Sequence, residues 1–121
     1  MGGNMRNAGN FGEIAAKNYL TAHGLEFVEM GYNTRFGELD LVMRDGGTIV
    51  FAEVKLRRDR RYGEAREFIS PSKQRKLRAT AQIWLAAHDP DAVCRFDAVE
   101  VYAPDGVKTE RLEIIHLPDA F

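Results

Sequence analysis

One stretch, residues 37–56 (GELDLVMRDGGTIVFAEVKL), constrains the fold of this chain more than any other. Two runs rich in apolar residues flank Gly46 and Gly47. Glycine tolerates the positive φ angles that a two-residue hairpin loop requires. We therefore predict a β-hairpin with these two glycines as its loop and with Asp45 paired with Thr48.

This register places four charged side chains on one face of the hairpin. Asp40 falls opposite Glu53, and Glu38 falls opposite Lys55. Two carboxylates with Cβ atoms about 5 Å apart repel each other unless positive charge lies between them. Asp40 and Glu53 offer the hard oxygen ligands that suit Mg²⁺ or Mn²⁺, and Lys55 is placed to orient or deprotonate a water beside the metal. The alternative is a solvated hairpin face with a Glu38–Lys55 pair.

The opposite face of the hairpin is continuous apolar surface, which predicts packing against helices. It consists of Leu39, Leu41, Met43, Val50, Ala52 and Val54.

The remaining pattern predicts an α/β (α+β) fold in which helices flank a mixed sheet, with the order α-β-β-β-α-β-β. We expect residues 1–9 to be a flexible N-terminus and residues 10–121 to form a single domain. Asn10 and Ser70 are the expected N-caps, and Pro71 suits the first position of the second helix. Outside the hairpin, the expected helices are 10–22 and 71–87, and the expected strands are 25–32, 93–102 and about 112–115.

Charge is segregated along the chain, although the net charge is only −1. Residues 55–78 hold ten Lys and Arg residues against three acidic ones. Cations near a helix N-terminus oppose the helix dipole, so an anionic partner explains them better than the helix does. We expect nucleic-acid contacts here, with Tyr62 stacking on an unpaired base, against the alternative of a solvated loop and helix face. The expected contacts are Arg57, Arg58, Arg60, Arg61, Tyr62, Lys73, Arg75, Lys76 and Arg78.

Asp40 followed by Glu53-Val54-Lys55 resembles the split PD-(D/E)XK signature of the restriction-endonuclease-like nucleases, with Leu39 in place of the proline. The wider pattern resembles the YraN-like uncharacterised bacterial family, which is similar to Holliday-junction resolvases. The resemblance implies a restriction-endonuclease-like fold with Asp40, Glu53 and Lys55 as catalytic residues. It also implies Glu13 as a third metal ligand beside Asp40 and Glu53, and Gln74 as a catalytic polar residue. Stabilisation by the helix dipole explains Glu13 equally well, and an exposed helix glutamine explains Gln74. The further motifs that carry the resemblance are Gly12-Glu13, Gly37-Glu38-Leu39-Asp40-Leu41, Glu53-Val54-Lys55-Leu56-Arg57, Lys73-Gln74-Arg75-Lys76 and Arg95-Phe96-Asp97.

The sequence also indicates in which compartment of the cell the protein is found. It has no apolar run near the 18 residues of a transmembrane helix, and its first ten residues are too polar for a signal peptide. A single cysteine, Cys94, excludes an intramolecular disulfide and predicts a reducing compartment without structural zinc. We expect a soluble cytoplasmic protein, and a homodimer stays open. Arg95 and Asp97 are expected to form a structural pair.

Three functions compete at this point. The leading hypothesis is a Mg²⁺- or Mn²⁺-dependent endonuclease that hydrolyses phosphodiesters in DNA, with branched DNA among its substrates. A catalytically silent nucleic-acid-binding module with the same fold is the alternative. A protein-interaction domain with an acidic patch leaves the basic segment unexplained.

Overall fold

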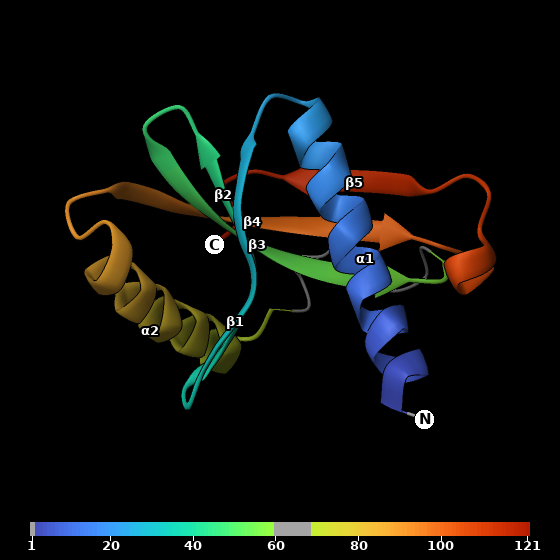
Figure 1. The fold of residues 1–121 in the computed structure, drawn as a ribbon, viewed down its shortest axis with the longest axis horizontal. Coiled ribbons are helices and arrows are strands. Elements are labelled where there is room, and N and C mark those ends of the chain that lie inside the picture. Colours follow the sequence, from blue (N-terminus) through green and yellow to red (C-terminus); the bar gives the residue numbers. More distant parts are fainter. Residues whose placement is uncertain (1, 60–68) are drawn as a thin grey trace.

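The computed structural model describes the backbone of residues 2–59 and 69–121, and the side chains from residue 10 onward within these ranges. A five-stranded sheet lies between two helices (Figure 1). Its strand order is β1-β2-β3-β4-β5; β3 and β4 are parallel, and the other neighbours are antiparallel. This is the predicted mixed α+β fold with the predicted order of helices and strands. The elements are α1 (Gly2–Ala22), β1 (Glu26–Thr34), β2 (Gly37–Asp45), β3 (Thr48–Arg57), α2 (Pro71–His88), β4 (Val93–Tyr102), the 3₁₀ turn η2 (Gly106–Lys108) and β5 (Glu113–Leu117).

The predicted hairpin register is confirmed from Asp45 opposite Thr48 to Leu41 opposite Ala52. Gly46 has a φ of +60°, in the left-handed region that glycine adopts without strain. The turn chemistry therefore fixes which residues of β2 and β3 face each other.

The predicted apolar face of the hairpin is wrong in one position. Leu39 packs with Val42 in the cluster on the α2 side of the sheet, whereas Leu41 and Met43 pack on the α1 side. The β2–β3 ladder ends at Leu41, and the side chain of Asp40 bonds to β3 instead. The alternation of side chains along β2 is therefore interrupted at the position where Asp40 leaves the ladder.

Both faces of the sheet are buried, so the hairpin does not have one core face and one chemical face. Leu20 of α1 packs with Val50 and Val99 on one side, while Trp84 of α2 packs with Phe51 on the other. In Figure 1, α1 crosses the sheet on one face and α2 lies on the other. Polar residues of the hairpin must therefore satisfy their charges within the protein or at the ends of the strands.

The start of α2 follows the predicted capping rule. The Ser70 hydroxyl accepts a hydrogen bond from the Lys73 backbone N–H at 3.1 Å, and Pro71 occupies the first helical position. The start of α1 differs from the prediction, because the helix begins at Gly2 and runs through Asn10. Arg57 also differs, since it closes β3 opposite Tyr102 and is not part of a loop.

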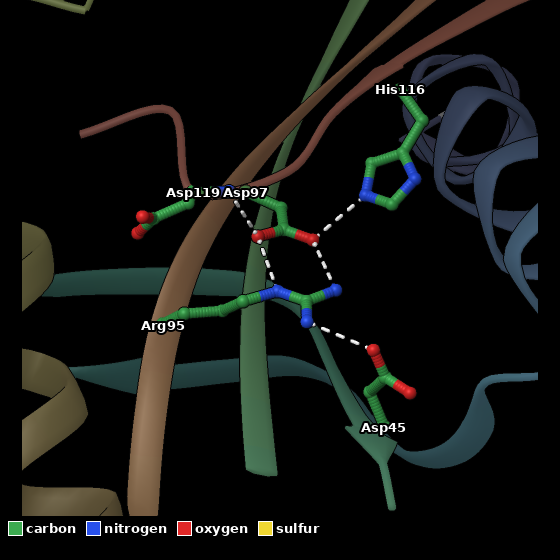
Figure 2. A network of polar contacts seen from close by, with 5 residues as sticks. All are labelled: Asp45, Arg95, Asp97, His116 and Asp119. Atoms are coloured by element: carbon green, nitrogen blue, oxygen red, sulfur yellow. Dashed lines mark hydrogen bonds and ion pairs between the residues drawn. The ribbon is translucent and has the colours of Figure 1, made fainter.

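A buried ionic network ties the C-terminal segment to the sheet (Figure 2). Asp97 is fully buried and accepts bonds from Arg95 Nε at 3.0 Å, His116 Nε2 at 2.7 Å and the Asp119 backbone N–H at 2.9 Å. Arg95 also contacts Asp45 at 2.8 Å. The prediction of a structural Arg95–Asp97 pair is confirmed, and the network links β2, β4, β5 and the residues after β5.

None of the helices in the described part of the chain is long and apolar enough to cross a membrane.

Asp97→Ala should destabilise the protein strongly, because it leaves Arg95 and His116 without their buried carboxylate. We expect a loss of about 3–5 kcal/mol in the free energy of unfolding, measured by urea denaturation. Asp91 is exposed, so Asp91→Ala serves as the control and should change stability by less than about 0.5 kcal/mol. Equal effects of the two substitutions would show that the network contributes nothing specific.

Candidate functional site

The site begins where β2 and β3 leave their ladder. Beyond the Leu41–Ala52 pair, the Asp40 carboxylate accepts a hydrogen bond from the Val54 backbone N–H at 2.9 Å. This bond replaces a bond between the two backbones and turns the Asp40 side chain toward β3. The predicted neighbourhood of Asp40 and Glu53 is thus formed through a side-chain bond and not through continued strand pairing.

Glu53 is held by two lysines from different elements. Its side chain is only 4% exposed, and its Oε1 atom lies 2.6 Å from Lys73 Nζ and 3.5 Å from Lys55 Nζ. Lys55 lies two residues further along β3, on the same side of the strand, and Lys73 reaches in from the first turn of α2. Glu53 is therefore a fixed, charge-compensated carboxylate.

Helix α1 brings a further acid to the same place. Gly12 of α1 lies beside Leu56 of β3, because a Cβ on Gly12 would be in van der Waals contact with Leu56 Cβ at 3.4 Å. The next residue, Glu13, forms a group with Glu38 and Asp40 in which one carboxylate oxygen from each lies within 4.8 Å of the others. Acids from α1 and β2 thus converge next to the Glu53–lysine cluster.

The crowding of acids changes their proton affinity. Burial and the charge of Glu53 raise the pKa of Asp40 to about 8, although the Val54 N–H works in the opposite direction. Burial, Glu38 and Glu53 raise the pKa of Glu13 as well. Asp40 therefore holds its proton at neutral pH unless a further positive charge comes close to its carboxylate.

The two lysines shift in opposite directions. Burial and the neighbouring Lys73 lower the pKa of Lys55, which brings its neutral form closer to physiological pH. For Lys73, burial is the largest single effect and acts to lower the pKa. The hydrogen bonds to Glu53 and Lys55 and the charges of Glu53 and Asp40 together outweigh burial, so the pKa of Lys73 is raised. Lys73 is therefore the permanent counter-charge of Glu53, and Lys55 is the lysine better suited to exchange a proton.

A small cavity of about 10 Å³ adjoins Asp40 and Glu53. This volume is at the lower limit for one water molecule. Its other walls are Leu39, Phe51, Ala52, Leu77, Phe96 and Phe121. Of the described residues, Asp40 and Glu53 are the only ionisable ones that line this cavity, and its other lining residues are apolar. A water there would have polar partners on one side only.

The structure brings together most of the residues predicted for catalysis and metal binding. Asp40, Glu53, Lys55 and Glu13 meet at one place, whereas Gln74 uses its side-chain N–H₂ to donate to the Ile69 carbonyl at 3.0 Å. That bond uses one of the two N–H donors of the amide and fixes the chain just before α2.

The cations predicted to contact nucleic acid are spread over three locations. Lys73 lies in the site itself, and Arg75, Lys76 and Arg78 are exposed on α2. Arg58 follows the end of β3. Arg57 approaches the buried Glu100, with Nε 3.8 Å from Oε2. Arg60, Arg61 and Tyr62 lie outside the described residues.

Sequence reasoning missed two acids. Glu38 was placed on the same face as Asp40 but was not assigned to the site, and a Glu38–Lys55 pair was the alternative; in the structure Glu38 groups with Glu13 and Asp40. Glu100 is fully buried opposite Lys55 on β4, and it accepts a hydrogen bond from the Tyr102 hydroxyl at 2.9 Å. An acid inside the apolar run Val-Glu-Val-Tyr was the available signal for Glu100, since buried acids rarely occur without a partner.

The sequence of the chain matches a known protein family. Residues 12–101 match the model of the uncharacterised protein family UPF0102. The chain belongs to UPF0102. The match runs from Gly12 at the site through Val101 and includes every acid and lysine of the site.

Individual UPF0102 relatives cover most of the chain. A UPF0102 protein of Shewanella woodyi is 41% identical over 116 residues, which cover 96% of this chain and 92% of the relative. One from Symbiobacterium thermophilum is 46% identical over 104 residues, covering 84% and 87%. The UPF0102 protein YraN of Escherichia coli is 46% identical over 97 residues, covering 78% and 74%.

The raised pKa of Asp40 predicts how stability changes with pH in the absence of metal. Between about pH 4 and about pH 8, the folded protein keeps a proton on Asp40 that the unfolded chain has released, so stability falls as pH rises through this window. Asp40→Asn cannot titrate and should flatten the fall of the melting temperature between these limits. Glu13 contributes a slope of the same sign that remains in the variant.

Melting curves in the presence of a chelator, recorded across this pH range, test the expectation. Asp91→Asn changes an exposed acid and should keep the wild-type slope. A wild-type slope in Asp40→Asn would contradict the assignment of the titrating group.

Proposed function

We propose that this UPF0102 protein is a metal-dependent endonuclease-like enzyme of the PD-(D/E)XK superfamily that binds nucleic acid and hydrolyses phosphodiesters. DNA is the favoured substrate, with branched DNA among the candidates, and a DNA substrate places the protein in the cytoplasm. The observation that carries the proposal is the position of Glu53. This carboxylate is fixed by Lys73 and Lys55 directly beside Asp40 and the acids of α1 and β2.

The donor set fits a divalent cation. Mg²⁺ binds oxygen ligands at about 2.0–2.1 Å, so two ligands of one ion lie at most about 4.2 Å apart. The oxygens of Glu13, Glu38 and Asp40 lie within 4.8 Å of one another, so small side-chain movements suffice. A bound Mg²⁺ or Mn²⁺ would polarise a phosphoryl oxygen and lower the pKa of a bound water.

The residues of the chain supply the remaining functions. Asp40 is anchored by the Val54 N–H and presents its carboxylate to the cation. Lys73 forms an ion pair with Glu53 at 2.6 Å and holds this carboxylate in place. Lys55 has a lowered pKa and is in position to take a proton from a water or to place positive charge beside the phosphate.

The cations of α2 support the proposal that the substrate is a polyanion. Lys73 joins the site directly to the helix that carries Arg75, Lys76 and Arg78. These exposed side chains repel one another on one helix, and a phosphate backbone would offset that repulsion. A phosphate chain bound along α2 would therefore lead to the acids.

We predict that the wild-type protein cleaves single-stranded, duplex or four-way DNA in Mn²⁺ and that Asp40→Ala abolishes cleavage. Lys55→Met, which removes the amine but keeps the length of the side chain, should lower the rate by about 10²–10⁴-fold and leave binding of DNA in place. Lys17→Met is a matched control on α1. The measurement is product formation on gels with end-labelled substrates.

Cleavage that survives Asp40→Ala would come from another site or a contaminant. Binding of DNA without cleavage of any of the three substrates would leave the non-cleaving module as the function.

A second prediction concerns electrostatics. Replacing Arg58, Arg75 and Lys76 together by Ala should reduce the log–log salt slope of DNA binding by about 0.9 for each phosphate that the variant no longer neutralises. Arg57 is kept because its removal would leave the buried Glu100 without that cation. Binding is measured by fluorescence anisotropy at several salt concentrations.

Lys17 and Arg44 lie away from the exposed cations of α2 and serve as the control pair, since Lys17 covers Phe27 and Arg44 faces Asp89. A slope that changes as much in their double Ala variant as in the triple variant would show that DNA does not follow α2.

A further inference from the structure

A second cavity lies on the α2 side of the sheet, between α2 and β4. Its volume is about 150 Å³. The lining residues are Arg78, Ala81, Gln82 and Leu85 of α2 and Cys94 and Phe96 of β4. None of these six residues is acidic, so the cavity presents no repulsion to an anionic chain that passes over it.

The walls of this cavity suit a flat, polar ring. The Arg78 guanidinium lies 4.7 Å from the centre of the Phe96 ring, so a cationic plane and an aromatic plane are already in contact at one wall. Phe96 is held by Phe51 and Phe121, each with its ring centre 5.4 Å away. Gln82 adds an amide that both donates and accepts hydrogen bonds at the exposed rim.

The size of the cavity is also appropriate. A closed apolar cavity of about 150 Å³ holds a benzene molecule, so the space accommodates one six-membered ring. Apolar surface from Ala81 and Leu85 would cover the ring faces, and the amide and guanidinium would meet its edge. A linear aliphatic ligand would leave the stacking surface and the polar rim unused.

The cavity is adjacent to the acids. Phe96 lines both this cavity and the small one beside Asp40 and Glu53. Glu53 pairs with Ala98 in the parallel β3–β4 ladder, and Phe96 and Cys94 lie two and four residues before Ala98. At about 3.3 Å per residue, the cavity is about 7–13 Å from the acids along the strand.

We propose that this cavity binds one unpaired nucleobase of the substrate, next to the phosphate that lies at the acids. The inference rests on the proposed function and narrows its substrate class to nucleic acids with an unpaired nucleotide near the site of cleavage. A fully paired base cannot enter, because both its stacking faces and its pairing edge are occupied in the duplex.

The test compares two hairpin DNAs that differ in one base. One carries a single bulged thymidine, and the other carries an abasic nucleotide at the same place, so backbone and charge are identical. Stacking of one base contributes at least about fivefold in affinity, so the wild-type protein should bind the base-containing bulge at least about fivefold more tightly in fluorescence anisotropy.

Two variants that keep the charge of the protein show whether the preference for the base-containing bulge comes from this cavity. Cys94→Leu fills the cavity and should abolish the preference while keeping the affinity for the abasic hairpin. Val93→Leu is the matched control on the same strand, because Val93 is 69% exposed and does not line the cavity; it should behave as wild type.

Cys94 is the single cysteine of the chain, so its modification by a maleimide, followed by mass spectrometry, reports on the cavity directly. The bulged base should slow the modification of the wild-type protein at least about fivefold relative to the abasic hairpin.

The possible results separate the two proposals. Equal affinity of wild type for the two hairpins, or a preference that survives Cys94→Leu, overturns the base site and leaves the proposed function standing. If the wild-type protein binds neither of the hairpins nor the four-way DNA, the base site and the proposed function are both overturned.

Discussion

A buried carboxylate requires a partner that cannot move away, and in this protein the ion pair between Glu53 and Lys73 meets that requirement across two elements. Glu53 comes from the centre of the sheet, and Lys73 comes from the first turn of α2. The Ser70 cap and the bond from Gln74 to Ile69 fix that turn. The start of α2 and the geometry of the acids therefore depend on each other. A displaced α2 would take the Lys73 ammonium away from the Glu53 carboxylate. Without Glu53, the Lys73 ammonium would lose its partner in turn.

Two acids of the same sheet, the fully buried Asp97 and the partly buried Asp40, show what distinguishes a structural group from a candidate functional one. Burial alone would raise the pKa of Asp97, but hydrogen bonds from His116, Arg95 and the Asp119 backbone more than offset it and the pKa is lowered. Burial and the acids around Asp40 raise its pKa, and its one hydrogen bond from a backbone N–H does not offset them. Asp97 is satisfied by the protein itself. Asp40 is satisfied by a proton, or by a cation that takes the place of that proton.

Much of the site was predictable from the sequence because the side-chain period of a strand is two and the Gly46-Gly47 turn sets the register. Ser70-Pro71 likewise predicted the start of α2. The interruption at Asp40 was not predictable, because a side chain that replaces a ladder bond leaves no periodic signal. For this reason Leu39 was assigned to the wrong face, and Glu38 was not assigned to the site. The position of Lys73 also depends on how α2 packs, which local pattern does not determine.

We propose that the acids of α1, β2 and β3 form one cation site. Anomalous diffraction from crystals grown with Mn²⁺ tests this proposal, because it locates the ion independently of any activity. We expect a single strong anomalous peak in contact with the Asp40 carboxylate and with at least one of Glu13, Glu38 and Glu53. A Mn²⁺ peak bound elsewhere, with no anomalous density at Asp40, would show that these acids do not form the site.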